Sequence, residues 1–143
     1  MADSIDRFRG WYGFLSNFHT CEIVYQGVAF PSSENAYQAA KFPKWTWGAF
    51  TNCSAATSKK RSRMMKSWQR KDWHRVKVDI MRDLIAIKFT AGSKLAGWLL
   101  RTGDSLLVEG NSHGDRFWGK VDGVGENHLG ELLMERRNIL SEL

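Results

Sequence analysis

The stretch DWHRVKVDIMRDLIAIKFT, residues 72–90, is the longest periodic segment of the sequence and decides its fold class. Apolar side chains recur in it at spacings of three and four residues, which is typical of one face of an α-helix. The members of this stripe are Trp73, Val76, Ile80, Met81, Leu84 and Ile87. The pattern predicts a long helix that forms the spine of a hydrophobic core.

Two shorter elements precede this helix. In CEIVYQGVAF, residues 21–30, β-branched and aromatic residues lie on both sides of Gln26-Gly27, which predicts a short β-hairpin. Pro31-Ser32-Ser33 then ends the strand and supplies an N-cap hydroxyl for a helix over residues 33–42, which Pro43 closes. No clear period appears between residues 45 and 52.

Cap residues also place the other expected helices. Ser54 is expected to cap a helix that runs through the basic segment 59–63 towards Trp68, and Ser93 a short helix that ends at Gly103. Residues 105–109 favour a brief strand, and the glycine-rich segment 110–126 a long loop. Asn127 is expected to cap a final helix. Its inner stripe would be Leu129, Leu132, Leu133 and Leu140.

The composition bounds the class of protein. At 143 residues, with 43% hydrophobic and 25% charged residues, the chain fits one globular domain over residues 1–143. The expected fold class is mainly α, an α+β arrangement with a small β-hairpin. No apolar run suits a membrane span and MADSIDRFRG lacks the apolar core of a signal peptide, so we expect a cytoplasmic protein without a membrane partner. The two cysteines, Cys21 and Cys53, are expected to be small buried residues.

The charge balance points to an anionic partner. The formal net charge is +6, from 21 Lys and Arg against 15 Asp and Glu, and the pI is about 9.6. This balance suits a phosphate-bearing small molecule or a nucleic acid and does not choose between them. The basic run 59–63 could be a nucleic-acid patch or a phosphate clamp, but short Lys and Arg clusters on a helix are more often an ordinary soluble surface.

The predicted helix at 33–42 carries polar residues that could form a site. Glu34, Gln38 and Lys41 are spaced as i, i+4 and i+7 and therefore share one stripe. The same spacing also fits a solvated face of the helix, and spacing alone favours that alternative. The loop HGDRFWGK also has two interpretations. Asp115 and Trp118 could contact a ligand, or they could belong to an ordinary structural turn.

Several site classes have no support in the sequence. The four histidines show no metal-ligand spacing, so no metal site is expected. Neither GxGxxG nor GxxxxGK[ST] occurs, which excludes a P-loop, and no GxSxG elbow is present. We expect no cofactor.

Seven motifs in order resemble one family along nearly the whole chain. They are GFLSNF at 13–18, FPSSENAYQAAKF at 30–42, WHRVKVDIM at 73–81, LIAIKF at 84–89, LLRTGDSLLVE at 99–109, DRFWG at 115–119 and GENHLGELLMERR at 125–137. Their order and spacing are similar to the NADAR family, also called YbiA-like. No single motif is specific, whereas the whole series is.

The resemblance implies a YbiA-like, mainly helical single domain that hydrolyses N-glycosidic bonds. The substrates it implies are phosphorylated ribosylamine intermediates of riboflavin synthesis, or ADP-ribose on guanine of modified DNA or RNA. A non-catalytic module that binds ADP-ribose or NAD as a sensor is the alternative. The oligomeric state stays open.

The matching motifs also imply the site residues. Glu34, Lys41 and Asp115 are the expected catalytic residues. The expected substrate-binding residues are Asn17, Arg63, Trp73, Trp118, Gly119 and Asn127. Two positions depart from the common pattern of the family, Asn35 where many relatives have His and Ser62 where Gly is frequent, so the choice of substrate is less defined than the reaction.

Overall fold

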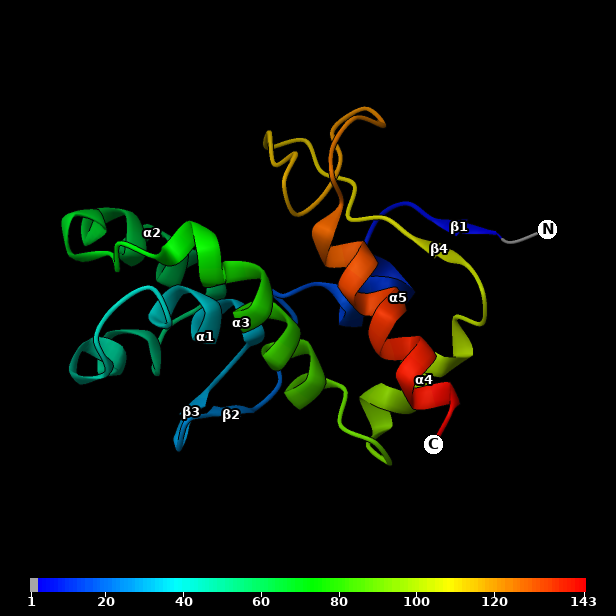
Figure 1. Cartoon of the computed structure of the whole chain (residues 1–143), viewed down its shortest axis with the longest axis horizontal. Helices are drawn as coiled ribbons and strands as arrows, with labels where there is room; N and C mark the ends of the chain where they lie inside the picture. The colour runs from blue at the N-terminus through cyan, green and yellow to red at the C-terminus, as the bar shows by residue number, and fades with distance from the viewer. Residues whose placement is uncertain (1–2) are drawn as a thin grey trace. The chain divides into compact units, whose positions relative to one another are not determined.

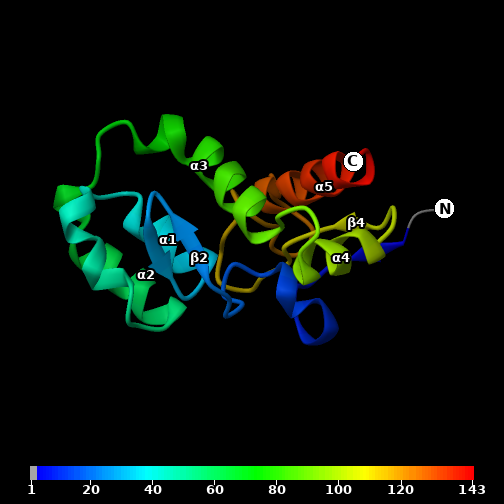
Figure 2. The same cartoon turned by 90° about the horizontal axis from the view of Figure 1, so that it is seen from below.

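The computed structural model describes residues 3–143. The chain divides into two compact units, here called unit 1, Met1–Ser16 with Phe89–Leu143, and unit 2, Asn17–Lys88 (Figures 1 and 2). Each unit is described by itself below. The expectation of one domain over residues 1–143 stays a prediction.

Unit 2 contains the predicted hairpin. Strands β2 (Ile23–Tyr25) and β3 (Val28–Phe30) pair antiparallel. Gln26 and Gly27 form the turn with φ of 48° and 81°. Positive φ at both central residues matches the right-handed twist of the strands, which explains why a Gln-Gly pair connects them.

Helix α1 (Ser33–Ala39) follows the hairpin and is buried along its whole length. Ser32 caps it, because its Oγ accepts the backbone N–H of Asn35 at 3.1 Å. The helix ends at Ala39, three residues before the predicted end. The prediction that its polar stripe favours a solvated face is wrong, since α2, α3 and the hairpin all pack on α1.

Two 3₁₀ segments and helix α2 follow. The 3₁₀ segment η2 (Lys44–Phe50) was not predicted, because a 3₁₀ turn has no 3.6-residue period. Helix α2 (Ala55–Met64) begins at the predicted cap, Ser54, and the 3₁₀ segment η3 (Lys66–Trp68) replaces its predicted last turns. Helix α2 buries only Ser58 and Ser62, so it packs through small side chains.

The long helix α3 (Trp73–Lys88) confirms the prediction from residues 72–90. Its buried face holds Trp73, Ile80, Met81, Leu84 and Ile85. Val76 and Ile87 were expected in this stripe and are only half-buried. The helical period therefore located the helix correctly, but it assigned Val76 and Ile87 to the buried face although they lie at its margin.

Unit 1 joins the two ends of the chain. The short strand β1 (Ser4–Ile5) pairs parallel with β4 (Leu106–Leu107), with Ser4 opposite Leu106. The 3₁₀ segment η1 (Gly10–Leu15) brings Phe14 edge-on to Phe89 and Trp98, with ring centroids 6.4 and 5.5 Å apart. Helix α4 (Lys94–Arg101) begins at its predicted cap, Ser93.

Helix α5 (His128–Ser141) buries the predicted leucines and packs on α4 and β4. The predicted side-chain cap is wrong. Asn127 precedes the helix with a left-handed φ of 54°, and its side chain makes no cap bond. Its amide instead accepts the N–H of Glu109 at 2.9 Å and donates to the carbonyl of Leu107 at 2.9 Å. The amide thus fastens the start of α5 to the segment after β4.

The fold class is confirmed as mainly helical α+β with two small two-stranded sheets. Residues 110–126 form the predicted loop, crossed by isolated bridges between Gly110 and Lys120 and between Val121 and Val124. Across residues 3–143 no helix is long and apolar enough to cross a membrane. Cys21 and Cys53 are half-buried, where the sequence predicted full burial.

Candidate active site

Glu34 is a buried carboxylate in the first turn of α1, where the helix dipole favours a negative charge. Its backbone N–H donates to the carbonyl of Asn17 at 3.0 Å, which fixes the start of the helix. Its Oε2 accepts a 2.6 Å hydrogen bond from Nε2 of Gln38. A charge-assisted bond of this kind holds the carboxylate in one orientation.

Lys41 lies just beyond the end of α1 and is half-buried. Its Nζ is 5.4 Å from the centroid of the Tyr37 ring and 5.6 Å from that of Trp73, within the range of a cation–π contact. Burial lowers the pKa of Lys41 from its ordinary value of 10.5, and Glu34 opposes this shift. The positive charges of Lys59, Lys77 and Arg63 lower the pKa further. A larger fraction of Lys41 is therefore in the neutral form, which can act as a nucleophile, than for an exposed lysine at the same pH.

Gln38 is a residue of this site that the sequence analysis did not assign. It is 4% exposed, and its Oε1 has no hydrogen-bond partner among residues 3–143. A buried acceptor without a donor costs free energy unless a ligand supplies the donor. Its i+4 spacing from Glu34 placed it in the polar stripe expected from the sequence but assigned it no role.

Trp73 begins α3 and packs against α1. Its ring centroid lies 5.1 Å from that of Tyr37, with the planes at 57°. Trp73 is only 3% exposed, and its ring lies against Tyr37 and within cation–π range of Nζ of Lys41. Trp73 is therefore a core residue, as its place in the apolar stripe predicted. It also lies beside Lys41, the candidate nucleophile, and its contact with substrate stays a prediction.

Asn17 and Arg63 are two expected substrate-binding residues in unit 2. Asn17 is buried, and its Oδ1 accepts the hydroxyl of Ser33 at 3.0 Å while its Nδ2 contacts Sδ of Met81 at 3.5 Å. These contacts tie the chain before the hairpin to α1 and α3. Arg63 is exposed near the end of α2, and its charge acts on Lys41. Their contacts with substrate stay predictions.

The two positions that depart from the family pattern have structural roles. Asn35 is fully buried, and its Nδ2 donates to the carbonyls of Phe50 and Cys53, both at 2.9 Å. Its Oδ1 accepts the hydroxyl of Ser32 at 2.5 Å. Ser62 is one of the small buried residues of α2. Neither side chain is exposed to a ligand in this structure.

Asp115 organises the turn DRFWG in unit 1. Its Oδ1 accepts the backbone N–H groups of Phe117 at 3.1 Å and Trp118 at 2.9 Å. Asn111 holds the other side of this turn, donating to the carbonyl of Asp115 at 2.9 Å and accepting its N–H at 3.0 Å. The structural turn considered from the sequence is therefore present, and the catalytic role of Asp115 stays a prediction.

Gly119 and Trp118 complete this turn. A Cβ on Gly119 would lie 1.9 Å from the carbonyl oxygen of Glu109, so only glycine fits this close approach. The Trp118 ring stands edge-on to Phe117, with centroids 4.9 Å apart and planes at 86°. Asn127 uses both polar atoms of its amide for the backbone contacts given above. The substrate contacts of these three residues are likewise predictions.

Unit 2 thus brings together Glu34 and Lys41, with Gln38, Tyr37 and Trp73 around them. Asp115, Trp118, Gly119 and Asn127 belong to unit 1 and form a separate set. Within residues 3–143 there is no group of three or more His, Cys, Asp or Glu side chains that could hold a metal ion.

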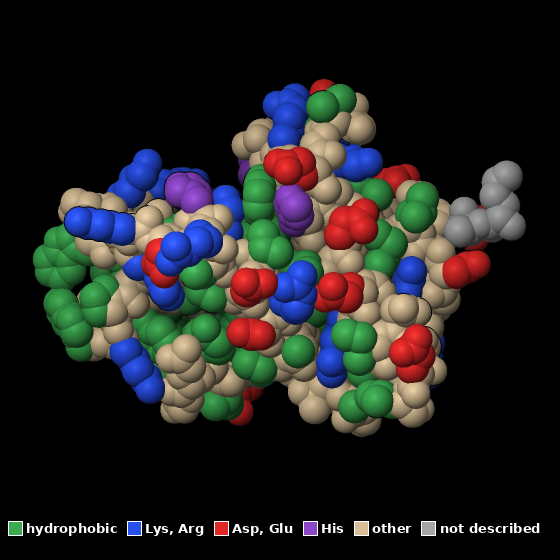
Figure 3. Space-filling view, in the orientation of Figure 1, with side chains coloured by type: hydrophobic (Ala, Val, Ile, Leu, Met, Phe, Trp, Pro, Cys, Tyr) green, Lys and Arg blue, Asp and Glu red, His purple; other side chains and the backbone are tan. Residues whose placement is uncertain are grey.

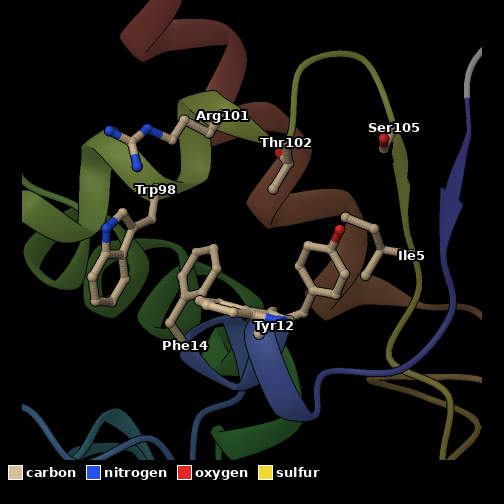
Figure 4. A pocket seen from close by; sticks show the side chains of 8 residues that line it. Ile5, Tyr12, Phe14, Trp98, Arg101, Thr102 and Ser105 are labelled. Carbon is tan, nitrogen blue, oxygen red and sulfur yellow. The ribbon is translucent and has the colours of Figure 1, made fainter.

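Unit 1 also contains a cavity of about 590 Å³ that includes none of the predicted residues (Figure 4). Its lining includes Trp11, Tyr12 and Phe14 of η1 and Trp98 and Arg101 of α4, and Figure 4 shows the Phe14 ring beside Trp98. The exposed rings in η1 gave no periodic signal in the sequence, because they lie in a 3₁₀ segment.

Comparison with known proteins defines the class. The NADAR domain model matches residues 7–141, and the chain belongs to the NADAR family. The resemblance inferred from the seven motifs is therefore confirmed.

Individual relatives carry more specific names. The chain is 38% identical over 144 residues to an N-glycosidase of Nostoc punctiforme, covering 91% of this chain and 89% of that protein. It is 35% identical over 147 residues to the N-glycosidase YbiA of Escherichia coli, covering 99% and 91%. A riboflavin biosynthesis protein of Vibrio vulnificus is 42% identical over 134 residues, which are 92% of this chain and 36% of that longer protein.

The fold agrees with these sequence relationships. The NMR structure of E. coli YbiA matches this structure with a TM-score of 0.84 and 34% identity, over 99% of this chain and 88% of that one. The YbiA-like fold is thus shown for the chain.

Proposed function

We propose that the protein is an N-glycosidase that hydrolyses the bond between a nitrogen and the anomeric carbon of a ribose phosphate or ADP-ribose. The observation that carries the proposal is a buried, hydrogen-bonded carboxylate, Glu34 on α1, whose charge acts on a half-buried amine of lowered pKa, Lys41, just beyond the end of that helix. The names of the N-glycosidase relatives support the reaction class. A lysine of lowered pKa beside a carboxylate is a typical feature of catalytic sites.

Glycosidic cleavage develops positive charge on the sugar and negative charge on the departing nitrogen. In the proposal, the Glu34 carboxylate lies beside the anomeric carbon and stabilises the first charge. Gln38 keeps that carboxylate oriented, and its unpartnered Oε1 accepts a hydrogen bond from a donor on the substrate. Asp115 is proposed as the second catalytic carboxylate, and only its place in the DRFWG motif supports this role.

Lys41 gives this reaction a covalent route. The neutral Nζ forms a bond to the anomeric carbon as the carbon–nitrogen bond to the base breaks, and the departing nitrogen takes a proton. The sugar ring then opens to an imine with Lys41, the ring oxygen taking a proton. One water hydrolyses the imine, which restores the amine and leaves an aldehyde at the former anomeric carbon, and the sugar hydroxyl then adds to this aldehyde to close the ring again. Borohydride added during turnover is expected to reduce the imine to a stable adduct on Lys41.

The substrate is a proposal in two forms. The name of the V. vulnificus relative favours a phosphorylated ribosylamine of riboflavin synthesis. The net charge of +6 favours ADP-ribosylated DNA or RNA. Both substrates contain a ribose whose anomeric carbon is bonded to nitrogen, and both carry a phosphate group. Arg63 is the proposed contact of that phosphate.

One experiment tests the function and separates these substrates. The protein is incubated with a ribosylaminopyrimidine phosphate, with an oligonucleotide carrying ADP-ribosylated guanine, and with NAD, and released base or sugar is detected by mass spectrometry. Release from the first or the second is expected. Binding to one substrate with release from none would show a sensor module and overturn the enzymatic proposal.

A further inference from the structure

Unit 2 carries an exposed pair of tryptophans away from its buried core. Trp45 in η2 is 76% exposed and Trp68 in η3 is 57% exposed. Their ring centroids are 5.6 Å apart and the planes are tilted by 55°. Large rings are usually buried, and contiguous exposed apolar surface marks an interaction site. The tilt leaves two ring faces in different planes open to a ligand.

The sequence around this pair is strongly basic. No Asp or Glu occurs from residue 35 to residue 71. The same stretch contains Lys41, Lys44, Lys59, Lys60, Arg61, Arg63, Lys66, Arg70 and Lys71. The basic excess of the chain therefore lies in unit 2, which has 13 Lys and Arg against 5 Asp and Glu, whereas unit 1 has 8 against 10.

The surface shows the same grouping. Hydrophobic side chains gather over η2 and η3, at the left end of Figure 3, with Lys and Arg beside them. Arg61 is partly committed to structure, since its Nη1 donates to the carbonyl of Ala49 at 2.6 Å. Arg70 pairs with Asp72 through bonds of 2.6 and 2.9 Å. Lys66 lies in η3 together with Trp68, Lys60 lies on the preceding helix α2, and both lysines are exposed.

We infer that this surface, here called the Trp45–Trp68 platform, binds a single strand of nucleic acid. Unstacked bases lie on the two indole faces, and the phosphates contact Lys60 and Lys66. Aromatic faces combined with a positive groove are the general means of binding single strands without sequence preference. A duplex hides its base faces, so it gains only the electrostatic part of this interaction.

An anionic membrane is the other surface that basic and aromatic residues can bind. Membrane-surface helices need a continuous apolar stripe. From Ala55 to Arg63, α2 carries only small, polar and basic side chains, in the order AATSKKRSR. The observations therefore favour nucleic acid. The inference does not require the proposed function, because the platform lies on η2, α2 and η3 and contains none of the proposed catalytic residues.

Fluorescence anisotropy with an unmodified, labelled single-stranded oligonucleotide tests the inference. Trp45→Ala combined with Trp68→Ala is expected to weaken binding by at least about tenfold, from the loss of stacking. Trp45→Phe with Trp68→Phe should restore most of the affinity. Trp11→Ala is the matched control, since Trp11 is 93% exposed and belongs to unit 1. It should bind like the wild type.

The salt dependence tests the charges separately. Lys60→Gln with Lys66→Gln should reduce the slope of log Kd against log salt by about 1.4, as expected for two lost contacts with a single strand. Arg9→Gln with Lys94→Gln, two exposed positions of unit 1, should leave the slope unchanged. Circular dichroism verifies that each variant is folded.

Three outcomes would overturn the inference. These are no binding of the oligonucleotide, equal loss in the platform and Trp11 variants, and binding of phosphatidylserine vesicles in place of the oligonucleotide. Release of base from a small substrate is measured in parallel. A platform variant that loses oligonucleotide binding is expected to keep that release, so failure of the platform and failure of the N-glycosidase proposal give different results.

Discussion

Nε2 of Gln38 donates a 2.6 Å hydrogen bond to Oε2 of Glu34, one turn earlier on the fully buried helix α1. The other atom of the same amide, Oε1, is buried without a donor among residues 3–143. One side chain therefore orients the candidate catalytic carboxylate and offers an acceptor of its own. A structural polar contact would be expected to satisfy both atoms.

Replacement of Gln38 tests this relationship. Gln38→Met keeps the volume and removes both polar atoms, so Glu34 loses its orienting bond. A hydrogen bond to a charged group contributes roughly 1.5 to 3 kcal/mol, which predicts a fall in kcat/KM of about 10- to 150-fold. Steady-state kinetics measure the change, with Gln69→Met as the control. A variant with wild-type kinetics would remove Gln38 from the site.

The pH dependence of the reaction tests the state of Lys41. Its pKa is lowered chiefly by burial, so the neutral amine forms at a lower pH than for an exposed lysine, and kcat should rise as Lys41 loses its proton. The charge of Arg63 contributes to the lowering. Arg63→Gln should raise the pKa and move the rising limb of the kcat profile to higher pH.

Arg75→Gln is the matched control for this experiment. It removes the same charge from unit 2, and Arg75 is not one of the groups that shift the pKa of Lys41. Its profile should follow the wild type. A limb that stays in place in Arg63→Gln, or moves to lower pH, would contradict the assignment of the limb to Lys41.

Replacement of Asn35 is expected to lower the stability of the fold without changing the reaction. Asn35→Ala leaves the buried carbonyls of Phe50 and Cys53 without their donor, which is expected to lower the free energy of unfolding by about 3 kcal/mol. Urea denaturation measures this loss, and the exposed Asn52→Ala should change it by less than about 0.5 kcal/mol. Because Asn35 is shielded from ligand, substrate preference should be unchanged. A switch of substrate would show instead that position 35 contacts the ligand.

The buried side chain of Lys88 is expected to make the free energy of unfolding depend on pH. It is 4% exposed, and burial lowers its pKa from 10.5 to about 8. Between these two values the unfolded chain binds more protons than the folded one, so the free energy of unfolding rises as pH increases from about 8 to 10.5. The expected rise from this residue is about 3 kcal/mol.

Urea denaturation at pH 8 and pH 10.5 measures this rise. Lys88→Met removes the titrating group and should make the stability nearly independent of pH over this interval relative to the wild type. The exposed Lys71→Met should retain the wild-type dependence. Equal pH dependence in Lys88→Met and the wild type would show that Lys88 keeps its proton when folded.

The sequence predicted the elements that have a period or a cap. The α3 stripe, the Gln-Gly hairpin turn and the serine caps at 32, 54 and 93 are local features, and each is present. The segments η1 and η2 were missed because 3₁₀ turns lack the helical period. The β1–β4 pair was missed because each strand has two residues and its partner lies about a hundred positions away.

In the candidate site, too, local features could be predicted from the sequence, and features that depend on tertiary contacts could not. The stripe on α1 was visible from spacing, but its burial depends on α2, α3 and the hairpin, which spacing alone does not reveal. The roles of Asn35 and Asn127 were missed for this reason, since their amides bind carbonyls 15 to 20 residues away. The exposed platform tryptophans could have been noticed beside the acid-free basic stretch.

The central claim is that Glu34 and Lys41 carry out N-glycosidic hydrolysis. The most direct test is single-turnover release of base by the wild type, Glu34→Gln and Lys41→Met, on whichever of the three substrates the wild type cleaves fastest. We expect release by the wild type and a loss of about 1,000-fold or more in each variant, with the fold retained. Release at near wild-type rates in either variant, or release from none of the three substrates by the wild type, would contradict it.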